Sequence, residues 1–164
     1  MRNVPKNLWH IRRFNASRLY ESPYIKISKR CESYKLCGYP KDAPYFQVQG
    51  ENSTYKVILE NTRVLFRTAD GIVYILFAST KNSGKYKVSK IIMVDINGGH
   101  GPNTFGKDVF FFIRTENGFV KPYGYNLQQA RVNADCSNKG HGYTCAEIIS
   151  RNEWQIPENY PIKL

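Results

Sequence analysis

The sequence lacks long apolar runs and the common catalytic motifs. Nowhere in its 164 residues do about 20 apolar residues follow one another, and Met1 to Phe14 hold no apolar segment of signal-peptide length. It contains no Walker loop, dinucleotide fingerprint, nucleophile elbow or His-Glu-x-x-His motif. Internal repeats and low-complexity tracts are also absent. These absences argue against the familiar nucleotide-dependent and hydrolytic enzyme classes, and we expect a protein that is not an enzyme.

Acidic residues are few, and the excess of basic residues is unevenly distributed along the chain. The chain has 24 Lys and Arg against 13 Asp and Glu, a net charge of +11. Residues 1–41 hold 10 basic and 2 acidic residues, so most of the excess is N-terminal. Such a segment suits a phosphate-rich surface, either nucleic acid or anionic lipid. The basic residues are scattered, however, and a solvated cationic face explains them more simply.

Cysteine is also scarce, and its spacing is informative. Five residues separate Cys31 from Cys37 and eight separate Cys136 from Cys145, wider spacings than those of typical zinc knuckles. Two local disulfides, Cys31–Cys37 and Cys136–Cys145, are therefore predicted. Disulfides persist in oxidising compartments, which favours the periplasm or the cell surface. Because no export signal precedes this region, we expect the natural chain to begin further upstream.

The remaining pattern predicts an α+β domain. A helix is expected near residues 7–20 and a loop over residues 31–44, so that residues 1–44 form a helical and loop segment of a single domain. Residues 45–164 follow as the sheet-bearing part. Tight turns at Asp70-Gly71 and Asn117-Gly118 join aromatic and β-branched runs, which predicts an antiparallel meander of four to six strands. The segments with strand character are 45–49, 54–60, 62–68, 72–77, 85–96, 108–115 and 119–121, from which the four to six strands of the sheet are expected.

Beyond the strands, the C-terminal third contains few periodic segments. It is predicted to be mostly irregular and stapled by its disulfide. One short helix is expected over Cys145 to Asn152, where Thr144 and Glu147 have the spacing of a capping box.

The glycine-rich segment from Val94 to Phe110 carries the most chemistry. Asp95, Asn97 and Asp108 flank its turn, and carboxylate and amide oxygens are the ligands that calcium prefers. The spacing is not that of an EF-hand. The same residues also stabilise turns through side-chain bonds to the backbone, and that interpretation stays open beside a calcium site.

Two histidines offer a different chemistry. His100 and His141 both lie in glycine-rich loops, and two histidines with nearby lysines are the minimum for an acid–base ribonuclease or another nucleic-acid site. Surface loop residues without a catalytic role are the simpler interpretation of both.

The glycine-rich segment also carries a family resemblance. Asp95-Ile96-Asn97-Gly98, Gly101-Pro102-Asn103 and Gly106-Lys107-Asp108-Val109-Phe110 resemble a signature of type IV pilin-like and type II secretion prepilin-type proteins. Weaker similarities fall in the family's order across residues 18–160, at 24–31, 69–71, 121–124, 142–149 and 154–157.

The resemblance implies a long N-terminal helix packed on an antiparallel sheet. It implies a structural subunit or minor component of a type IV pilus or type II secretion pseudopilus. Its partners would be other pilin or pseudopilin subunits, and the inner membrane through the apolar half of the helix, which this sequence lacks. The family's calcium-binding loops favour Asp95, Asn97 and Asp108 as calcium ligands. No small-molecule substrate is expected.

A second function class stays open beside the assembly subunit. The alternative is a secreted basic nucleic-acid-binding protein or ribonuclease that uses His100 or His141. A minor pilin that takes up DNA would combine the two.

Overall fold

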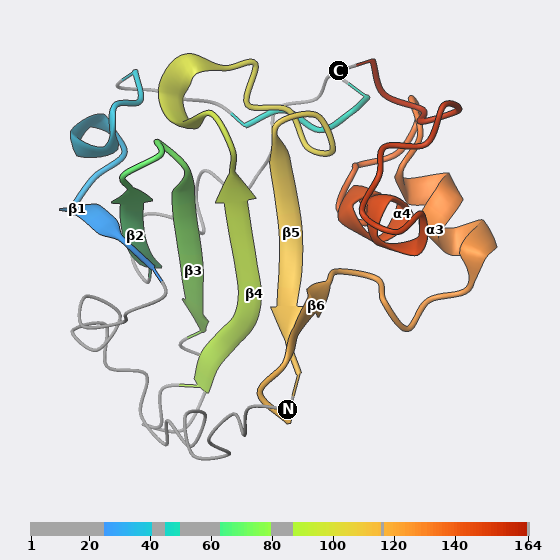
Figure 1. Ribbon diagram of the computed structural model, residues 1–164, viewed down its shortest axis with the longest axis horizontal. Helices are drawn as coiled ribbons and strands as arrows, with labels where there is room; N and C mark the ends of the chain where they lie inside the picture. Colours follow the sequence, from blue (N-terminus) through green and yellow to red (C-terminus); the bar gives the residue numbers. More distant parts are fainter. Residues whose placement is uncertain (1–24, 41–44, 50–62, 80–86, 116, 164) are drawn as a thin grey trace, which may run out of the picture.

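A computed structural model describes residues 25–40, 45–49, 63–79, 87–115 and 117–163. Its centre is one six-stranded sheet whose strands follow chain order, and each strand is antiparallel to its neighbour (Figure 1). The strands are β1 (Ile27–Cys31), β2 (Arg63–Thr68), β3 (Val73–Ser79), β4 (Lys87–Asp95), β5 (Val109–Arg114) and β6 (Val120–Pro122). The predicted antiparallel meander and the α+β class are confirmed. The helix expected near 7–20 and the strand expected at 54–60 lie outside the described residues.

Strand β1 corrects the prediction of a helical and loop segment up to residue 44. It pairs with β2 as an edge strand, and Ser28, Lys29 and Arg30 are exposed along it. Ile25 and Ile27 alternate with polar residues, the period of a half-buried strand, and charged residues are typical of sheet edges. The segment 45–49, predicted as a strand, makes only an isolated bridge between Phe46 and Thr104.

The side chains on one face of the sheet, here called the inner face, are buried. The register places Leu65, Ile75, Met93 and Phe111 in one row across four strands, each at most 2% exposed. Segments outside the strands close over this row and the one beside it. The inner-face core consists of Cys31, Cys37, Tyr39, Tyr45, Leu65, Val73, Ile75, Met93, Phe105, Val109 and Phe111.

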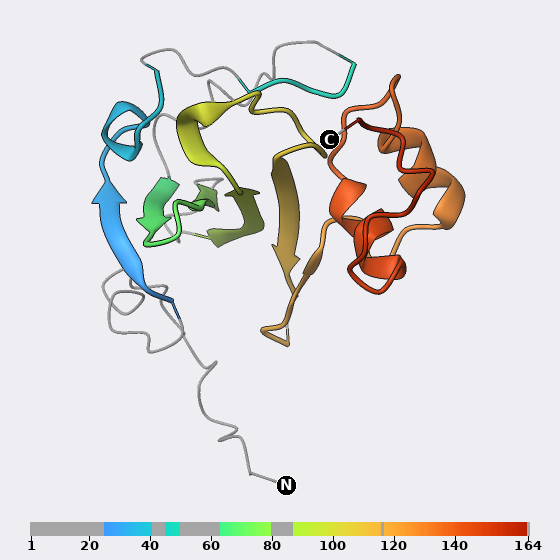
Figure 2. The ribbon, with the colours of Figure 1, turned by 45° about the horizontal axis from the view of Figure 1, so that its top comes forward.

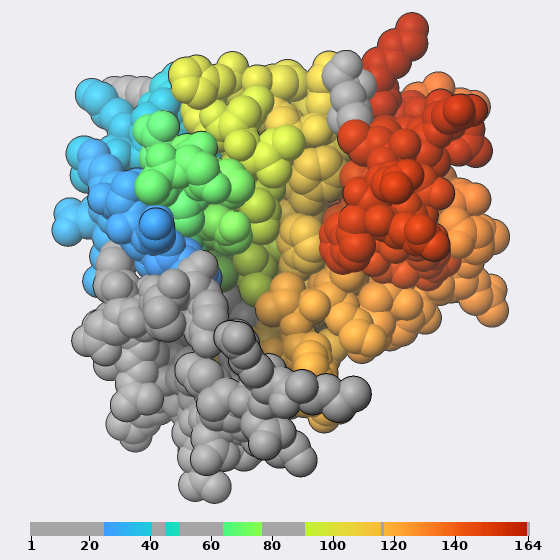
Figure 3. Space-filling view, viewed as in Figure 1, coloured from blue at the N-terminus to red at the C-terminus, as the bar shows by residue number. Residues whose placement is uncertain are grey.

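The opposite face, here called the outer face, is equally apolar but only partly covered. Alternation along the strands turns two rows of side chains towards it. They are Phe66, Tyr74, Val94 and Phe110 in one row, and Val64, Leu76, Ile92 and Phe112 in the other. Phe66 is buried and stacks on Tyr74, whereas the other seven are half-buried. On the side drawn in Figure 3, atoms of the central strands reach the surface between β1 and the C-terminal segment.

Two short helices lie beside the β5–β6 end of the sheet (Figures 1 and 2). Helix α3 (Gln129–Asp135) was not predicted, whereas α4 (Cys145–Arg151) occupies the predicted position. The predicted capping box is wrong, because the Thr144 hydroxyl donates to the Val132 carbonyl 2.9 Å away and makes no capping bond in α4. Among the described residues, no helix has the length and apolar character needed to cross a membrane.

Both predicted disulfides are confirmed. Cys31–Cys37 ties the end of β1 to the short 3-10 helix η1 (Lys35–Cys37), with Cα atoms 5.4 Å apart. Cys136–Cys145 ties the end of α3 to the start of α4, with Cα atoms 4.9 Å apart. Each bridge closes a short loop, as the spacing predicts.

Candidate functional site in the loop between β4 and β5

The sheet brings the two ends of the glycine-rich loop together. Asp95, the last residue of β4, pairs with Val109, the first residue of β5. Beyond this pair, the Ile96 amide donates to the Asp108 carbonyl at 2.9 Å. The intervening loop contains the short 3-10 helix η2 (Gly98–His100). The carboxyl-bearing residues 95 and 108 therefore lie beside each other at the end of two paired strands.

The carboxyl group of Asp95 is completely buried. Its Oδ2 accepts a hydrogen bond of 2.6 Å from the Tyr39 hydroxyl, and its Oδ1 accepts one of 3.3 Å from the backbone N–H of Asn97. The pKa of Asp95 is raised to about 7, chiefly by burial and also by the nearby Asp108 carboxylate, while the hydrogen bond from Tyr39 lowers it. Asp95 is therefore poised to hold or release a proton near neutral pH.

Asp108 has a different set of partners. Its Oδ2 accepts a hydrogen bond from the backbone N–H of Asn103 at 2.8 Å, and its Oδ1 accepts one from the backbone N–H of Thr104 at 2.6 Å. These bonds hold Asn103 at a φ of 54°, a left-handed conformation that Asn tolerates better than most residues. Asp108 thus closes the turn through the backbone, as the turn-stabilising interpretation requires.

Two amide oxygens beside these carboxylates are buried without a hydrogen-bond partner in the described part of the chain. They are Oδ1 of Asn97 and Oδ1 of Asn103. The Nδ2 of Asn97 is engaged, donating to the Gly101 carbonyl at 2.8 Å. Buried polar atoms without partners are costly, and they are often a sign of an ion or water. The loop therefore offers carboxylate and amide oxygens, the donor type of a hard cation. Within the described ranges, however, no three His, Cys, Asp or Glu side chains gather in a group that could hold a metal.

A cluster of three tyrosines covers Asp95, and sequence reasoning missed it. The rings of Tyr34, Tyr39 and Tyr45 meet edge to face, with centroids 5.4 to 6.0 Å apart. Burial raises the pKa of Tyr39 and of Tyr45 well above the ordinary range. The only signal in the sequence was the density of tyrosine around the Cys31–Cys37 loop.

A glycine fixes how closely η1 and η2 approach each other. A Cβ at Gly99 would lie 2.1 Å from the carbonyl oxygen of Gly38, so only glycine fits there. The backbone of Gly99 therefore lies directly against the backbone of Gly38 and Tyr39.

The two candidate histidines lie in separate parts of the fold. His100 is exposed in η2, above the β4 end of the sheet, and His141 lies between α3 and α4 on the other side of β5 (Figures 1 and 2). The His141 ring stacks on Tyr143, and its Nδ1 lies 3.7 Å from Asp135. The geometry does not combine them into one acid–base pair.

Comparison with known proteins adds no relative: the chain matches no model of a known protein family, no curated protein and no solved structure.

Proposed function

We propose that this chain is the extracytoplasmic domain of an assembly subunit, either of a type IV pilus or of a type II secretion pseudopilus. In this proposal it binds neighbouring subunits and catalyses no reaction. The observation that carries the proposal is the outer face of the sheet.

An antiparallel sheet commonly packs one face on a core and turns the other to water, which gives alternating apolar and polar residues. Here β2 to β5 are apolar on both faces. Burying a side chain such as Phe or Leu contributes about 1.5–3 kcal/mol, so two half-covered rows represent a large unused stabilisation. An α-helix is about 10 Å wide, and the two rows lie two residues apart along each strand, a spacing of about 6.8 Å, so one helix lying across the strands would cover both rows.

A helix in that position is what the pilin resemblance implies. The polypeptide enters the sheet at β1, an edge strand, and a helix that precedes it would lie within reach of the outer face. In an assembly subunit the same helix continues into an apolar half that packs against neighbouring subunits and the inner membrane. The two confirmed disulfides fit an oxidising compartment, the periplasm or the cell surface.

We also propose that calcium stabilises the loop between β4 and β5. Asp95, Asn97 and Asp108 would hold the ion, with Oδ1 of Asn103 as a further oxygen. The proposal is supported by the two buried amide oxygens that have no hydrogen-bond partner among the described residues and by the burial of Asp95 and Asp108 near each other. A bound cation would neutralise their repulsion and satisfy the amide oxygens.

The direct test of the assembly function is incorporation into filaments. In cells that make the chain from its own gene, surface filaments are sheared off and probed with an antibody against the domain. We expect the native chain in the filament fraction, and its loss from that fraction when the pilus assembly ATPase is deleted.

Two Phe→Glu variants connect this test to the outer face. Phe110→Glu places a charge on the outer face, whereas Phe119→Glu changes a residue that is 67% exposed on the β5–β6 hairpin. The first variant should disappear from filaments and the second should remain, while circular dichroism of the purified chains shows that both are folded. If Phe110→Glu does not fold, Phe112→Ser serves as the milder outer-face variant. A chain secreted free into the medium and bound to nucleic acid would support the alternative function instead.

A further inference from the structure

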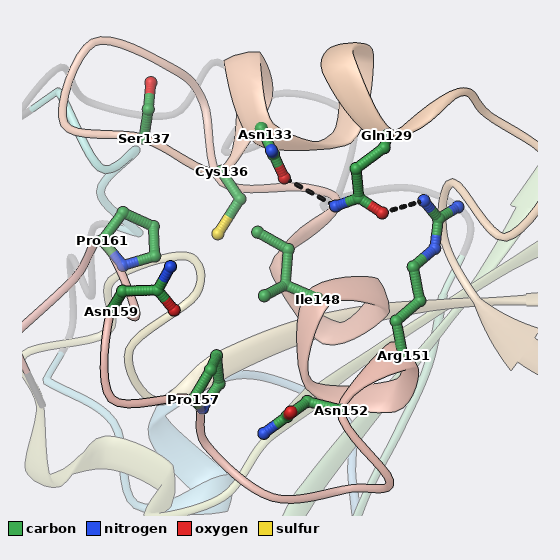
Figure 4. Close-up of a pocket in the computed structure, with 10 residues that line it drawn as sticks. All are labelled: Gln129, Asn133, Cys136, Ser137, Ile148, Arg151, Asn152, Pro157, Asn159 and Pro161. Carbon is green, nitrogen blue, oxygen red and sulfur yellow. Dashed lines mark hydrogen bonds between the residues drawn. The ribbon is translucent and has the colours of Figure 1, made fainter.

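An open pocket of about 440 Å³ lies between α3, α4 and the segment that follows α4 (Figure 4). Its volume falls within the range of small-molecule sites in proteins. Four side-chain amides dominate its polar lining, from Gln129, Asn133, Asn152 and Asn159. The rest of the lining is Cys136, Ser137, Ile148, Arg151, Pro157 and Pro161.

A chain of hydrogen bonds fixes the orientation of the amides along one side. Buried Glu147 accepts from Nε of Arg151 at 2.7 Å, and Nη1 of Arg151 donates to Oε1 of Gln129 at 2.6 Å. A guanidinium group only donates, so Gln129 must turn its oxygen to Arg151. Its Nε2 then donates to Oδ1 of Asn133 at 2.7 Å. Figure 4 shows these two bonds to Gln129 as dashed lines, and the amino group of Asn133 is left as a donor for a ligand.

The opposite side supplies acceptors. Nδ2 of Asn152 donates to the Gln155 carbonyl at 2.9 Å, which leaves Oδ1 of Asn152 for a ligand. The Asn159 side chain makes no hydrogen bond with any residue that the structure describes, and it can both donate and accept. The pocket thus offers a donor from Asn133 and an acceptor from Asn152. Its apolar lining includes Ile148 and the two prolines.

The pocket presents no free charge. Arg151, its one charged lining residue, is paired with Glu147 and also donates to the Leu127 carbonyl at 2.9 Å. An anion would find no unpaired cation, and a cation would find no carboxylate. The ligand that fits is neutral, with hydroxyl groups at its edge and an apolar surface beneath them.

The loop that supplies Asn152 and Pro157 also presents an aromatic ring to solvent. Trp154 is 61% exposed, and both Glu153 and Trp154 adopt positive φ values, 55° and 63°. Two consecutive non-glycine residues in the left-handed region are strained, and such strain is characteristic of functional loops. A flat aromatic surface on the loop that also supplies Asn152 suits a sugar ring that extends beyond the pocket, because a sugar combines apolar C–H faces with hydroxyl edges.

We propose that this pocket binds a neutral saccharide, a monosaccharide or a terminal disaccharide unit. The ligand is bound and not converted, because the lining contains no pair of carboxyl groups for glycoside hydrolysis. This site is independent of the outer face, so it stands whether or not the chain assembles into filaments.

The test is a titration of the whole chain, labelled with ¹⁵N, with a panel of glucose, galactose, mannose, N-acetylglucosamine and their disaccharides. We expect at least one to shift the side-chain amide signals of Asn133 and Asn159 and the indole signal of Trp154 in a saturable way. Asn133→Asp keeps the acceptor for Gln129 but replaces the amino group by an oxygen and adds a negative charge. It should weaken binding about tenfold or more.

Asn138→Asp is the matched control, because it makes the same change of charge at an exposed residue outside the pocket lining. It should bind as the native chain does. Trp154→Ala should also weaken binding, and the spectra themselves report whether each variant is folded. No saturable shift with any saccharide would overturn the proposal, as would equal shifts from triglycine or inorganic phosphate. Unchanged affinity in Asn133→Asp would also overturn it.

Discussion

The two faces of the sheet have the same chemistry but different cover. On the inner face, Tyr34 and Tyr39, which flank η1, close over the core together with Tyr45 and with Phe105 of the β4–β5 loop. On the outer face, a similar set of aromatic and aliphatic side chains is half-buried, with Phe66 alone among the eight buried. Apolar residues on both faces indicate that the sheet is built to lie between two layers. We therefore propose that a further layer of the protein or its assembly covers the outer face, and the predictions below test this proposal.

Phe110 and Phe111 provide the sharpest contrast, because they are neighbours in β5 and point to opposite faces. Phe111 is 2% exposed and packs edge to face on Phe105 at 4.7 Å. Phe111→Ala should lower the free energy of unfolding by about 3–5 kcal/mol. Phe110→Ala should lower it by about 1–2 kcal/mol, because its side chain is only half-buried. Urea unfolding of the purified chain measures both, and equal losses would mean that the two faces are covered alike.

Removing one disulfide or the other should give a smaller difference in stability than changing Phe111 or Phe110. By the chain-entropy model, each short loop contributes about 2–3 kcal/mol. The paired change of Cys136 and Cys145 to Ala should have the larger consequence. It removes two of the three buried residues of a small C-terminal cluster, whereas Cys31 and Cys37 belong to a large core. Differential scanning calorimetry of the two double variants ranks them. A larger loss of melting temperature from the Cys31 and Cys37 pair would contradict this account.

Asp95 should make the inner face sensitive to pH. Its pKa in the fold is about 7, above the ordinary value near 4, so the folded chain binds a proton that the unfolded chain releases between these values. The free energy of unfolding should therefore fall as pH rises from about 4 to about 7, by up to about 1.4 kcal/mol per unit, and level off above.

Asp95→Asn should flatten this slope while keeping an acceptor for the Tyr39 hydroxyl. Asp70→Asn is the control, since Asp70 lies exposed in the β2–β3 turn and its pKa is lowered by the Thr68 hydroxyl. Because the pKa of Asp70 is lowered in the fold, its carboxylate stabilises the folded chain at pH values above its ordinary pKa, and this stabilisation is lost only as the pH falls into the acid range. A slope that persists in Asp95→Asn would assign it to another group.

Calcium should change the free energy of unfolding less than the ionisation of Asp95 does. At neutral pH it should raise this free energy, whereas the ionisation of Asp95 lowers it. A ligand that binds only the folded chain at ten times its dissociation constant adds about 1.4 kcal/mol. Millimolar calcium should therefore raise the melting temperature of the native chain, and Asp108→Ala or Asp95→Asn should abolish the rise. Magnesium is the control, because it demands stricter geometry. No heat in calorimetry and no thermal shift would leave Asp95 and Asp108 as parts of a structural turn.

The meander and the cysteine pairing could be predicted because their signals are local. Asp70-Gly71 specifies a tight turn between two β-rich runs, and short spacing limits how cysteines can pair. Strand β1 was missed because its apolar residues are few and its exposed edge is basic. Helix α3 was missed because Val132 is its only buried residue, so it has no amphipathic stripe.

The site was only partly predictable for a different reason. The residues of the β4–β5 loop and the closeness of its two ends follow from the strand pattern. The tyrosines over Asp95 arrive from residues 34 to 45, and the pocket amides come from three separate segments. Such convergence depends on the tertiary fold, which no local pattern records.

The measurement that tests the central claim most directly is photo-crosslinking from the outer face. Phe110 is replaced by p-benzoyl-phenylalanine in cells that assemble filaments, with Phe119 replaced likewise as the exposed control. After irradiation, mass spectrometry identifies the captured peptide. Our account predicts that position 110 captures a helical segment that precedes β1, whereas position 119 does not. Capture of no peptide at position 110, or of the same peptides at both positions, would contradict it.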